Sequence, residues 1–254
     1  MKKRALIGYS GFVGSNLLEQ CEFDLKYNSK NFREMKVQSF SEIICAGVSA
    51  VKWQANKEPE LDKKRIQELM DVLSTVSASR FVLISTIDVY PSRQGHDEDF
   101  DCHSLPNHAY GSNRLYFEDF CLKTFPKCHI LRLPGLFGKG LKKNIIYDLL
   151  NKNGLEMINP RSSYQYYYLK NLWADIQKAI NEDIRIMNLF TAPICTKEIV
   201  DKFFEDTVYG SNPSPEGHYD LHTKYGSSGN YRYSRKNVFA HLQEFIEGYT
   251  GKAK

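Results

Sequence analysis

Short apolar runs alternate along this chain with segments whose apolar residues recur at helical spacing. The runs predict buried strands, and they lie at residues 5–7, 42–48, 80–86 and 129–133. Between the second and third runs, a helix is expected from about 60 to 77, with Pro59 at its start and one apolar face, formed by Leu61, Ile66, Leu69, Met70, Leu73 and Val76. Strands that alternate with helices predict an α/β fold with a doubly wound parallel sheet.

The remaining elements complete this pattern. We expect further strands at 23–27, 164–169 and 185–190, and helices at 15–21, 110–124, 145–151, 172–180, 196–205 and 236–249. The segment 31–41 is too short for a full strand and helix, so that part of the fold must be abbreviated. The polar segment 91–108 is expected to be a surface loop on the rim of the active site.

After Phe137 the regular alternation of strands and helices gives way to a basic loop and an aromatic segment, which predicts two domains. Residues 1–137, with a returning segment at about 165–192, are expected to form the domain that holds the sheet. Residues 138–164 and 193–254 are expected to form a smaller lobe. A chain of 254 residues is long enough to bury a sizeable core in this arrangement.

Composition excludes several classes of protein. A net charge of +4 is too small to indicate a nucleic-acid partner. A mean hydropathy of −0.47 and the lack of a long apolar run argue against a membrane span. The basic start, Met1 to Arg4, precedes an apolar stretch too short for a signal peptide. Six scattered cysteines without a Cys-x-x-Cys pair indicate reduced thiols in a cytoplasmic protein, and the pair His218 and His222 lacks a third ligand, so no metal site is predicted.

A glycine-rich turn follows the first strand. Gly8, Gly11 and Gly14 lie between the run 5–7 and the first helix, which is the context of a dinucleotide-binding turn. The turn could also be an ordinary strand-to-helix connection. In the first interpretation the cofactor-binding candidates at this turn are Gly8, Ser10, Gly11, Phe12, Val13 and Gly14.

The end of the second strand indicates which dinucleotide is bound. An NAD-binding fold usually has an acidic residue there, which binds the ribose hydroxyls. Here the strand runs into Asn28, Ser29 and Lys30, none of which is acidic. Ser29 and Lys30 could hold a 2′-phosphate, so NADP is favoured and NAD is the alternative. These residues could equally form a polar, solvated turn.

Four motifs in order resemble the extended short-chain dehydrogenase/reductase family, in its NAD(P)-dependent epimerase/dehydratase branch that acts on nucleotide sugars. They are Gly8-x-x-Gly11-x-x-Gly14, Ala46-Gly47, the run from Ile84 to Tyr90, and the run from Ala109 to Arg114. The segments 131–138 and 165–171 extend the resemblance over most of the chain. It implies a Rossmann-type domain with a small C-terminal substrate-binding lobe, in which Ala46, Gly47 and Pro134 also contact the cofactor.

The resemblance also implies a mechanism. In the family, a hydride moves between substrate and nicotinamide while a tyrosine exchanges a proton with the substrate oxygen. Tyr110 matches this tyrosine, and Thr86 matches a Ser/Thr whose hydroxyl polarises the same oxygen. Thr86 could instead be a capping or strand-end residue.

Position 114 departs from the family pattern. The family has a lysine one turn after the tyrosine, where it lowers the phenol pKa and binds the nicotinamide ribose; this chain has Arg114. Spacing of four residues places the guanidinium on the same helix face as Tyr110, and arginine keeps the charge but not the shape of lysine. The chain is therefore either an active enzyme with altered geometry or a cofactor-binding protein with weakened catalysis. We favour activity, because Thr86 and Tyr110 are both present.

Substrate recognition is expected to use residues outside this set. The candidates for contact with a nucleotide sugar are Asp88, Lys142, Asn144 and Arg161. Cations could bind the pyrophosphate of such a substrate, although the lysine-rich segment could also be a solvated loop. The predicted function is a nucleotide-sugar reductase or epimerase. The alternatives are a cofactor-binding sensor or scaffold, or a reductase of a carbonyl compound without a nucleotide. The family also implies a homodimer through the helices at 60–77 and 110–124.

Overall fold

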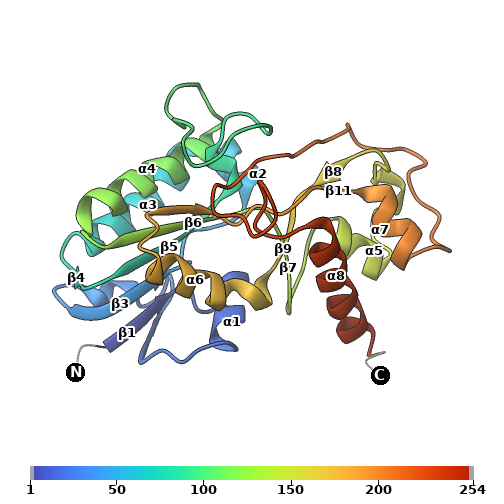
Figure 1. The fold of residues 1–254 in the computed structure, drawn as a ribbon. Coiled ribbons are helices and arrows are strands. Elements are labelled where there is room, and N and C mark those ends of the chain that lie inside the picture. Colours follow the sequence, from blue (N-terminus) through green and yellow to red (C-terminus); the bar gives the residue numbers. More distant parts are fainter. Residues whose placement is uncertain (1–2, 252–254) are drawn as a thin grey trace. The chain divides into compact units, whose positions relative to one another are not determined.

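The computed structural model describes residues 3–251 (Figure 1). Met1 and Lys2, from the basic start of the chain, and residues 252–254, at the end of the expected lobe, lie outside the described residues. The chain divides into two compact units. The first unit contains residues 1–91, 99–133 and 170–187, and the second contains 92–98, 134–169 and 188–254.

The main sheet confirms the predicted doubly wound α/β fold. Within residues 3–251 it has seven strands, in the order β10-β6-β5-β3-β1-β2, with β4 paired to β3. The strands are β1 (Lys3–Ile7), β2 (Leu25–Tyr27), β3 (Ser39–Cys45), β4 (Ser77–Ala78), β5 (Phe81–Thr86), β6 (Cys128–Leu133) and β10 (Ile186–Asn188). The pairings among β1 to β6 are parallel.

The strand order places the carboxyl ends of the central strands at one edge of the sheet. Ile7 at the end of β1 is in register with Tyr27 of β2 and Cys45 of β3. Thr86 at the end of β5 is in register with Leu133 of β6. Because the order reverses at β1, a ligand crevice is expected at this edge.

Helices cover both faces of this sheet (Figure 1). Those of the first unit are α1 (Phe12–Leu18), α2 (Lys52–Lys57), α3 (Pro59–Leu73), α4 (Ala109–Thr124) and α6 (Leu172–Asn181). α3 and α4 lie on one face, and α1 and α6 lie on the other. A core of fully buried apolar side chains, including Ile43, Leu73, Phe81 and Phe117, lies between the sheet and the first of these layers.

Several boundaries differ from the predicted ones. The first helix begins at Phe12 rather than Ser15, directly after the glycine turn. The helix predicted at 60–77 ends at Leu73, and α2 precedes it without an apolar stripe that would have predicted it. Leu61, assigned to the apolar face, is 40% exposed, whereas Asp62 is buried. The segment 31–41 is abbreviated as expected, because between β2 and β3 it forms the short 3-10 helix η1 (Phe32–Met35).

Up to residue 251, the described part of the second unit contains two small sheets and three α-helices. β7 (Gly135–Phe137) pairs in parallel with β9 (Tyr166–Tyr168), and β8 (Ser163–Tyr164) pairs antiparallel with β11 (Ile194–Cys195). The helices are α5 (Ile145–Asn151), α7 (Thr196–Phe203) and α8 (Arg235–Thr250), with the 3-10 helix η3 (Leu155–Met157). A further 3-10 helix, η4 (Leu169–Asn171), spans the boundary at residue 169.

Two polar side chains, the buried Gln165 and the partly buried Glu98, organise this second unit. Gln165 interrupts the strand predicted at 164–169: its amide nitrogen donates to the carbonyl oxygens of Thr191 and Leu221, and its side-chain oxygen accepts from the Leu221 N–H. Glu98 comes from the predicted rim loop, and its carboxylate accepts hydrogen bonds from the Asn188 N–H, the Thr223 hydroxyl and the Lys224 N–H. The rim loop is therefore not one exposed segment, since 92–98 is part of the second unit.

A search of residues 3–251 for a helix long and apolar enough to span a membrane finds none.

Candidate cofactor-binding and active site

The glycine turn brings β1, α1 and β3 into close contact. Gly8 has a φ of +87°, and a Cβ there would lie 2.3 Å from the carbonyl oxygen of Ala46. A Cβ on Gly14 would lie 2.1 Å from the carbonyl oxygen of Gly8. Both positions therefore require glycine, one for its backbone conformation and both for space. This tight turn at the switch point of the sheet fits the pyrophosphate of a dinucleotide.

A second turn closes the end of β2. The Asn28 side-chain oxygen accepts from the Lys30 N–H at 2.9 Å, and the Asn28 N–H donates to the Asn31 side-chain oxygen at 2.8 Å. These bonds fold residues 28–31 into a compact loop and leave the Ser29 and Lys30 side chains exposed. Among residues 3–251, the Lys30 ammonium has no ion-pair partner. The loop fits the 2′-phosphate interpretation without testing it.

Hydrogen bonds hold the start of α4 against the short segment that follows β5. The Asn107 amide donates to the carbonyl oxygens of Asp88 and Val89, at 2.9 and 3.1 Å. His108 caps the helix, because its Nδ1 accepts from the Gly111 N–H at 3.0 Å. These contacts hold the first turn of α4, which carries Tyr110, beside the short 3-10 helix η2 (Ile87–Val89) that follows Thr86.

Thr86 and Tyr110 lie next to each other, and their side chains are within hydrogen-bonding reach. Tyr110 is 6% exposed, and burial raises the pKa of its phenol above the ordinary value near 10. Hydrogen bonding with Arg114 and with Thr86 acts in the opposite direction and favours the phenolate. Thr86 also caps η2, since its hydroxyl accepts from the Asp88 N–H at 3.2 Å. The capping role and the placement beside Tyr110 therefore coexist.

Arg114 lies on the Tyr110 face of α4, as its spacing indicated. The carbon at the centre of its guanidinium is 4.3 Å from the centroid of the Tyr110 ring. Its terminal nitrogens donate to both oxygens of Asp62, at 2.7 and 3.0 Å, and one also donates to the Ser49 carbonyl oxygen at 2.5 Å. Asn113 donates a further hydrogen bond to Asp62 at 2.9 Å.

Arg114 acts on the phenol in the expected direction, because its charge and its hydrogen bond lower the pKa of Tyr110. The net pKa of Tyr110 is nevertheless raised. Burial of the phenol outweighs the attraction of Arg114, and the charge of Arg114 is shared with a carboxylate. Burial would also raise the pKa of Asp62, but the contacts with Arg114 and Asn113 hold it below its usual value.

Asp88 belongs to a charged cluster beside Thr86. Its carboxylate forms an ion pair with Lys52 of α2 and lies 3.6 Å from Nε2 of His108. Burial alone would raise the pKa of Asp88, but His108 and Lys52 lower it. Asp88 is therefore an anion that faces the Thr86 hydroxyl, with a lysine and a histidine next to it.

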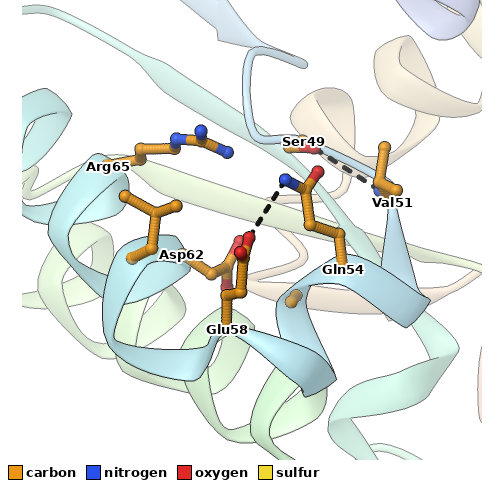
Figure 2. Close-up of a pocket in the computed structure, with 8 residues that line it drawn as sticks. Ser49, Val51, Gln54, Glu58, Asp62 and Arg65 are labelled. Atoms are coloured by element: carbon orange, nitrogen blue, oxygen red, sulfur yellow. Dashed lines mark hydrogen bonds between the residues drawn. The ribbon is translucent and has the colours of Figure 1, made fainter.

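Asp62 also lines a small polar cavity (Figure 2). Its volume is about 10 Å³, the scale of one water molecule. Figure 2 shows Gln54, Glu58, Asp62 and Arg65 turned toward the same space between α2 and α3. Gln54 donates to Glu58 at 3.2 Å, which closes one side of the cavity.

The predicted substrate residues Lys142, Asn144 and Arg161 belong to the second unit. Lys142 is exposed. Asn144 caps α5, because its side chain accepts from the Tyr147 N–H at 3.1 Å and donates to the Leu136 carbonyl oxygen at 2.9 Å. Arg161 pairs with Glu216 at 2.9 Å. Pro134 is the first residue of the second unit's main segment and is buried.

Sequence reasoning missed the residues that hold the predicted ones in place. Asp62, Asn113, Lys52, His108 and Asn107 were not singled out. Asp62 left a signal, because it lies four residues before Ile66 and so on the apolar face of α3. A carboxylate on an apolar helix face indicates a buried partner. Nothing in the sequence around Lys52 marks it. Within residues 3–251, no three His, Cys, Asp or Glu side chains are close enough together to hold a metal ion.

Comparison with known proteins shows the fold. No protein-family model matches the chain. No curated protein matches it by sequence. Among solved structures, it is similar to dTDP-4-dehydrorhamnose reductase from Bacillus anthracis in complex with NADP, at 18% identity over 100% of both chains with a TM-score of 0.68.

Two further structures with other activities share the fold. The dTDP-glucose 4,6-dehydratase DesIV from Streptomyces venezuelae, a double mutant with NAD bound, has a TM-score of 0.73 at 14% identity, over 97% of this chain and 98% of that one. UDP-glucose 4-epimerase from Thermotoga maritima, with UDP-glucose, has a TM-score of 0.66 at 12% identity, over 99% of both chains. The whole chain therefore has the fold of these proteins.

Proposed function

We propose that this protein is an NAD(P)-dependent enzyme of the extended short-chain dehydrogenase/reductase type, a reductase or epimerase of a nucleotide sugar. The observation that carries the proposal is the placement of Thr86, Tyr110 and Arg114 together at the carboxyl end of β5. Support comes from the fold, which the chain shares with a reductase, a dehydratase and an epimerase of nucleotide sugars.

The chain's own residues fit a dinucleotide. The turn from Gly8 to Gly14, with Ser10, Phe12 and Val13, would hold the pyrophosphate through backbone N–H groups. Ala46, Gly47 and Pro134 follow strands at the same edge of the sheet or adjoin it in sequence, and would border the cofactor. Asn28, Ser29 and Lys30 would bind the adenosine ribose, with Lys30 favouring NADP over NAD. The nicotinamide, when bound, supplies or accepts a hydride.

Tyr110 and Thr86 would handle the proton and the oxygen of the substrate. A phenol that keeps its proton can donate it to a developing alkoxide, and the Thr86 hydroxyl can hydrogen-bond the same oxygen. The raised pKa of Tyr110 suits proton donation better than proton removal near neutral pH. The phenol is therefore placed to act as the proton donor when a carbonyl is reduced.

We further propose that the second unit binds the nucleotide part of the substrate, through residues 138–164 and 193–254. Lys142 would meet a phosphate as an exposed cation. Arg161 would have to leave Glu216 to do the same, since the two are paired. Asn144 would contribute through its backbone, because its side chain caps α5.

The test begins with the purified protein. Mass spectrometry of the nucleotides that remain bound identifies the cofactor, and NADPH consumption is then followed with a panel of UDP- and dTDP-linked 4-keto sugars. Steady consumption identifies a reductase. Interconversion of two sugars without net oxidation identifies an epimerase. The proposal is wrong if the protein binds neither NADP nor NAD and converts no member of the panel.

A second candidate is a cofactor-binding sensor or scaffold, and one observation favours it. Arg114 is committed to Asp62 and the Ser49 carbonyl oxygen, and the pKa of Tyr110 is raised. Tight binding of NADPH with no turnover across the same panel would favour this candidate over the enzyme.

A further inference from the structure

Asp62 lies in the wall of the candidate site although it comes from a different helix. It is 6% exposed and is placed by α3, whereas Tyr110 and Arg114 lie on α4. Its carboxylate accepts three hydrogen bonds, two from Arg114 and one from Asn113. A buried carboxylate saturated in this way fixes the position of the groups that donate to it.

Asp62 fixes the guanidinium of Arg114 next to the phenol of Tyr110. Arginine has five N–H donors. Two of those on Arg114 bind Asp62 and one binds the Ser49 carbonyl oxygen, while the guanidinium stays 4.3 Å from the Tyr110 ring centroid. A lysine could not make this two-pronged contact. Asp62 and the Ser49 carbonyl oxygen thus hold the guanidinium by three hydrogen bonds, two of them to Asp62, and two donors are left for the phenol and a ligand.

We propose that Asp62 is a positioning residue of the active site, which holds the Arg114 guanidinium beside Tyr110 and offsets part of its charge there. An opposite charge paired with a cation reduces the field that the cation exerts on a third group. Burial is the largest cause of the raised pKa of Tyr110, and the Asp88 carboxylate adds to it, while Arg114 lowers it. The proposal deepens the proposed function, on which its consequence for catalysis rests.

Other charged groups lie close to Asp62, Arg114 and Tyr110 and contribute to the electrostatic potential at the phenol. They are Arg65 from α3, Lys52 from α2, Asp88 from η2 and His108 at the start of α4. Asp88 forms an ion pair with Lys52 and lies beside His108, and its charge raises the pKa of Tyr110. Arg65 borders the cavity beside Asp62, and it adds a second positive charge that acts on this carboxylate (Figure 2).

The experiment measures the titration of Tyr110 directly. The protein is isotope-labelled at the Cζ carbon of tyrosine, and the Tyr110 signal is assigned by its loss in Tyr110→Phe. Its midpoint is then compared in the unchanged protein and in Asp62→Asn, which removes the charge but keeps an acceptor. We expect the midpoint to fall by about one pH unit in Asp62→Asn, because the charge of Arg114 is no longer offset.

Asp71→Asn is the matched control. Asp71 is an exposed carboxylate on the same helix that accepts a hydrogen bond from Gln67, and its removal should leave the Tyr110 midpoint unchanged. Asp62→Glu keeps the charge, and we expect it to stay close to the unchanged protein. Asp62→Ser is made as a second neutral variant. The Tyr110 titration can then be decided if either Asp62→Asn or Asp62→Ser folds.

The outcomes separate this proposal from the proposed function. A Tyr110 midpoint that is unchanged or higher in a folded Asp62→Asn or Asp62→Ser protein overturns the role of Asp62. That titration needs no substrate, so it is decided even if no sugar is turned over. Where turnover is found, the limb of the pH profile for kcat/KM that reports Tyr110 should move with the midpoint, which a purely structural role would not produce.

Discussion

Arg114 and Asp62 form a two-pronged ion pair, with guanidinium-to-carboxylate distances of 2.7 and 3.0 Å, between helices α4 and α3. Both side chains are almost completely buried. The pair lies beside Tyr110, the tyrosine that we propose transfers the proton. A structural ion pair and the candidate catalytic centre therefore share a residue.

Replacing Asp62 by alanine should destabilise the fold strongly. The change leaves the Arg114 guanidinium buried without a counter-charge, which typically costs about 3–5 kcal/mol. Urea unfolding measures the loss, and Asp71→Ala on the same helix is the control, with an expected change within about 0.5 kcal/mol. If Asp62→Ala were as stable as Asp71→Ala, the ion pair of Asp62 with Arg114 would not be needed for the stability of the fold.

The same pair predicts how stability depends on pH. Burial would raise the pKa of Asp62, but Arg114 and Asn113 lower it below the ordinary value of about 3.9. A group with a lowered pKa in the folded state adds stability above its unfolded pKa, and that stability is lost as the pH falls through the folded value. The gap in unfolding free energy between the protein and Asp62→Ala should therefore be constant down to about pH 4 and shrink below it. A gap that widens in acid would contradict the assignment.

Tyr110→Phe should remove most catalysis while cofactor affinity stays nearly unchanged. The phenol is the group assigned to proton transfer, and its loss should reduce kcat about a hundredfold to ten-thousandfold. Tyr116→Phe is a close control, since Tyr116 lies on the same helix with an exposed ring and a hydroxyl bound to Gln67. Turnover and NADPH binding are measured separately. Full activity in Tyr110→Phe would show that another group carries the proton.

Lys30→Ala tests the choice of cofactor. If Lys30 binds the 2′-phosphate, the variant should bind NADPH about tenfold more weakly, the scale of one charge-assisted hydrogen bond, and bind NADH as before. Lys26→Ala removes an exposed lysine of β2, the strand that precedes this loop, and should change neither affinity. Equal weakening of NADPH and NADH would refute the 2′-phosphate argument.

Gly14→Ala should damage both the fold and the dinucleotide site. The new methyl group would lie 2.1 Å from the Gly8 carbonyl oxygen, so α1 would have to move away from β1 at a cost of about 1–3 kcal/mol. Gly248→Ala is the opposite case: it lies inside α8 with open space around it, and should stabilise the protein by up to about 1 kcal/mol. Thermal unfolding and NADPH titration compare the two; a Gly14→Ala protein that matched the parent in both would contradict the predicted close packing.

The features that the sequence predicts well are local. The strand of Ala5 to Ile7 and the turn at Gly8 need only a buried apolar run and a residue that tolerates positive φ. Helix α5 has the bounds predicted from its spacing, 145–151. The neighbourhood of Tyr110 and Arg114 also follows from helix periodicity alone.

What the sequence does not show depends on contacts between distant segments. Asp62 and Arg114 are 52 residues apart, and Lys52 and Asp88 are 36 apart, so no local pattern links them. The direction of the Tyr110 pKa shift follows from burial, which the sequence does not reveal at position 110. Gln165 splits a predicted strand because its amide binds Leu221, 56 residues later.

The division into two units has a consequence for biosynthesis. The chain passes from one unit to the other after residues 91, 98, 133, 169 and 187. Helix α6 and most of strand β10, which complete the first unit, are therefore made only after the whole segment 134–169 of the second unit has been synthesised. The first unit cannot finish folding until about residue 187 has been made, and a chain truncated at residue 133 should expose the unpaired edge of β6 and be prone to aggregation.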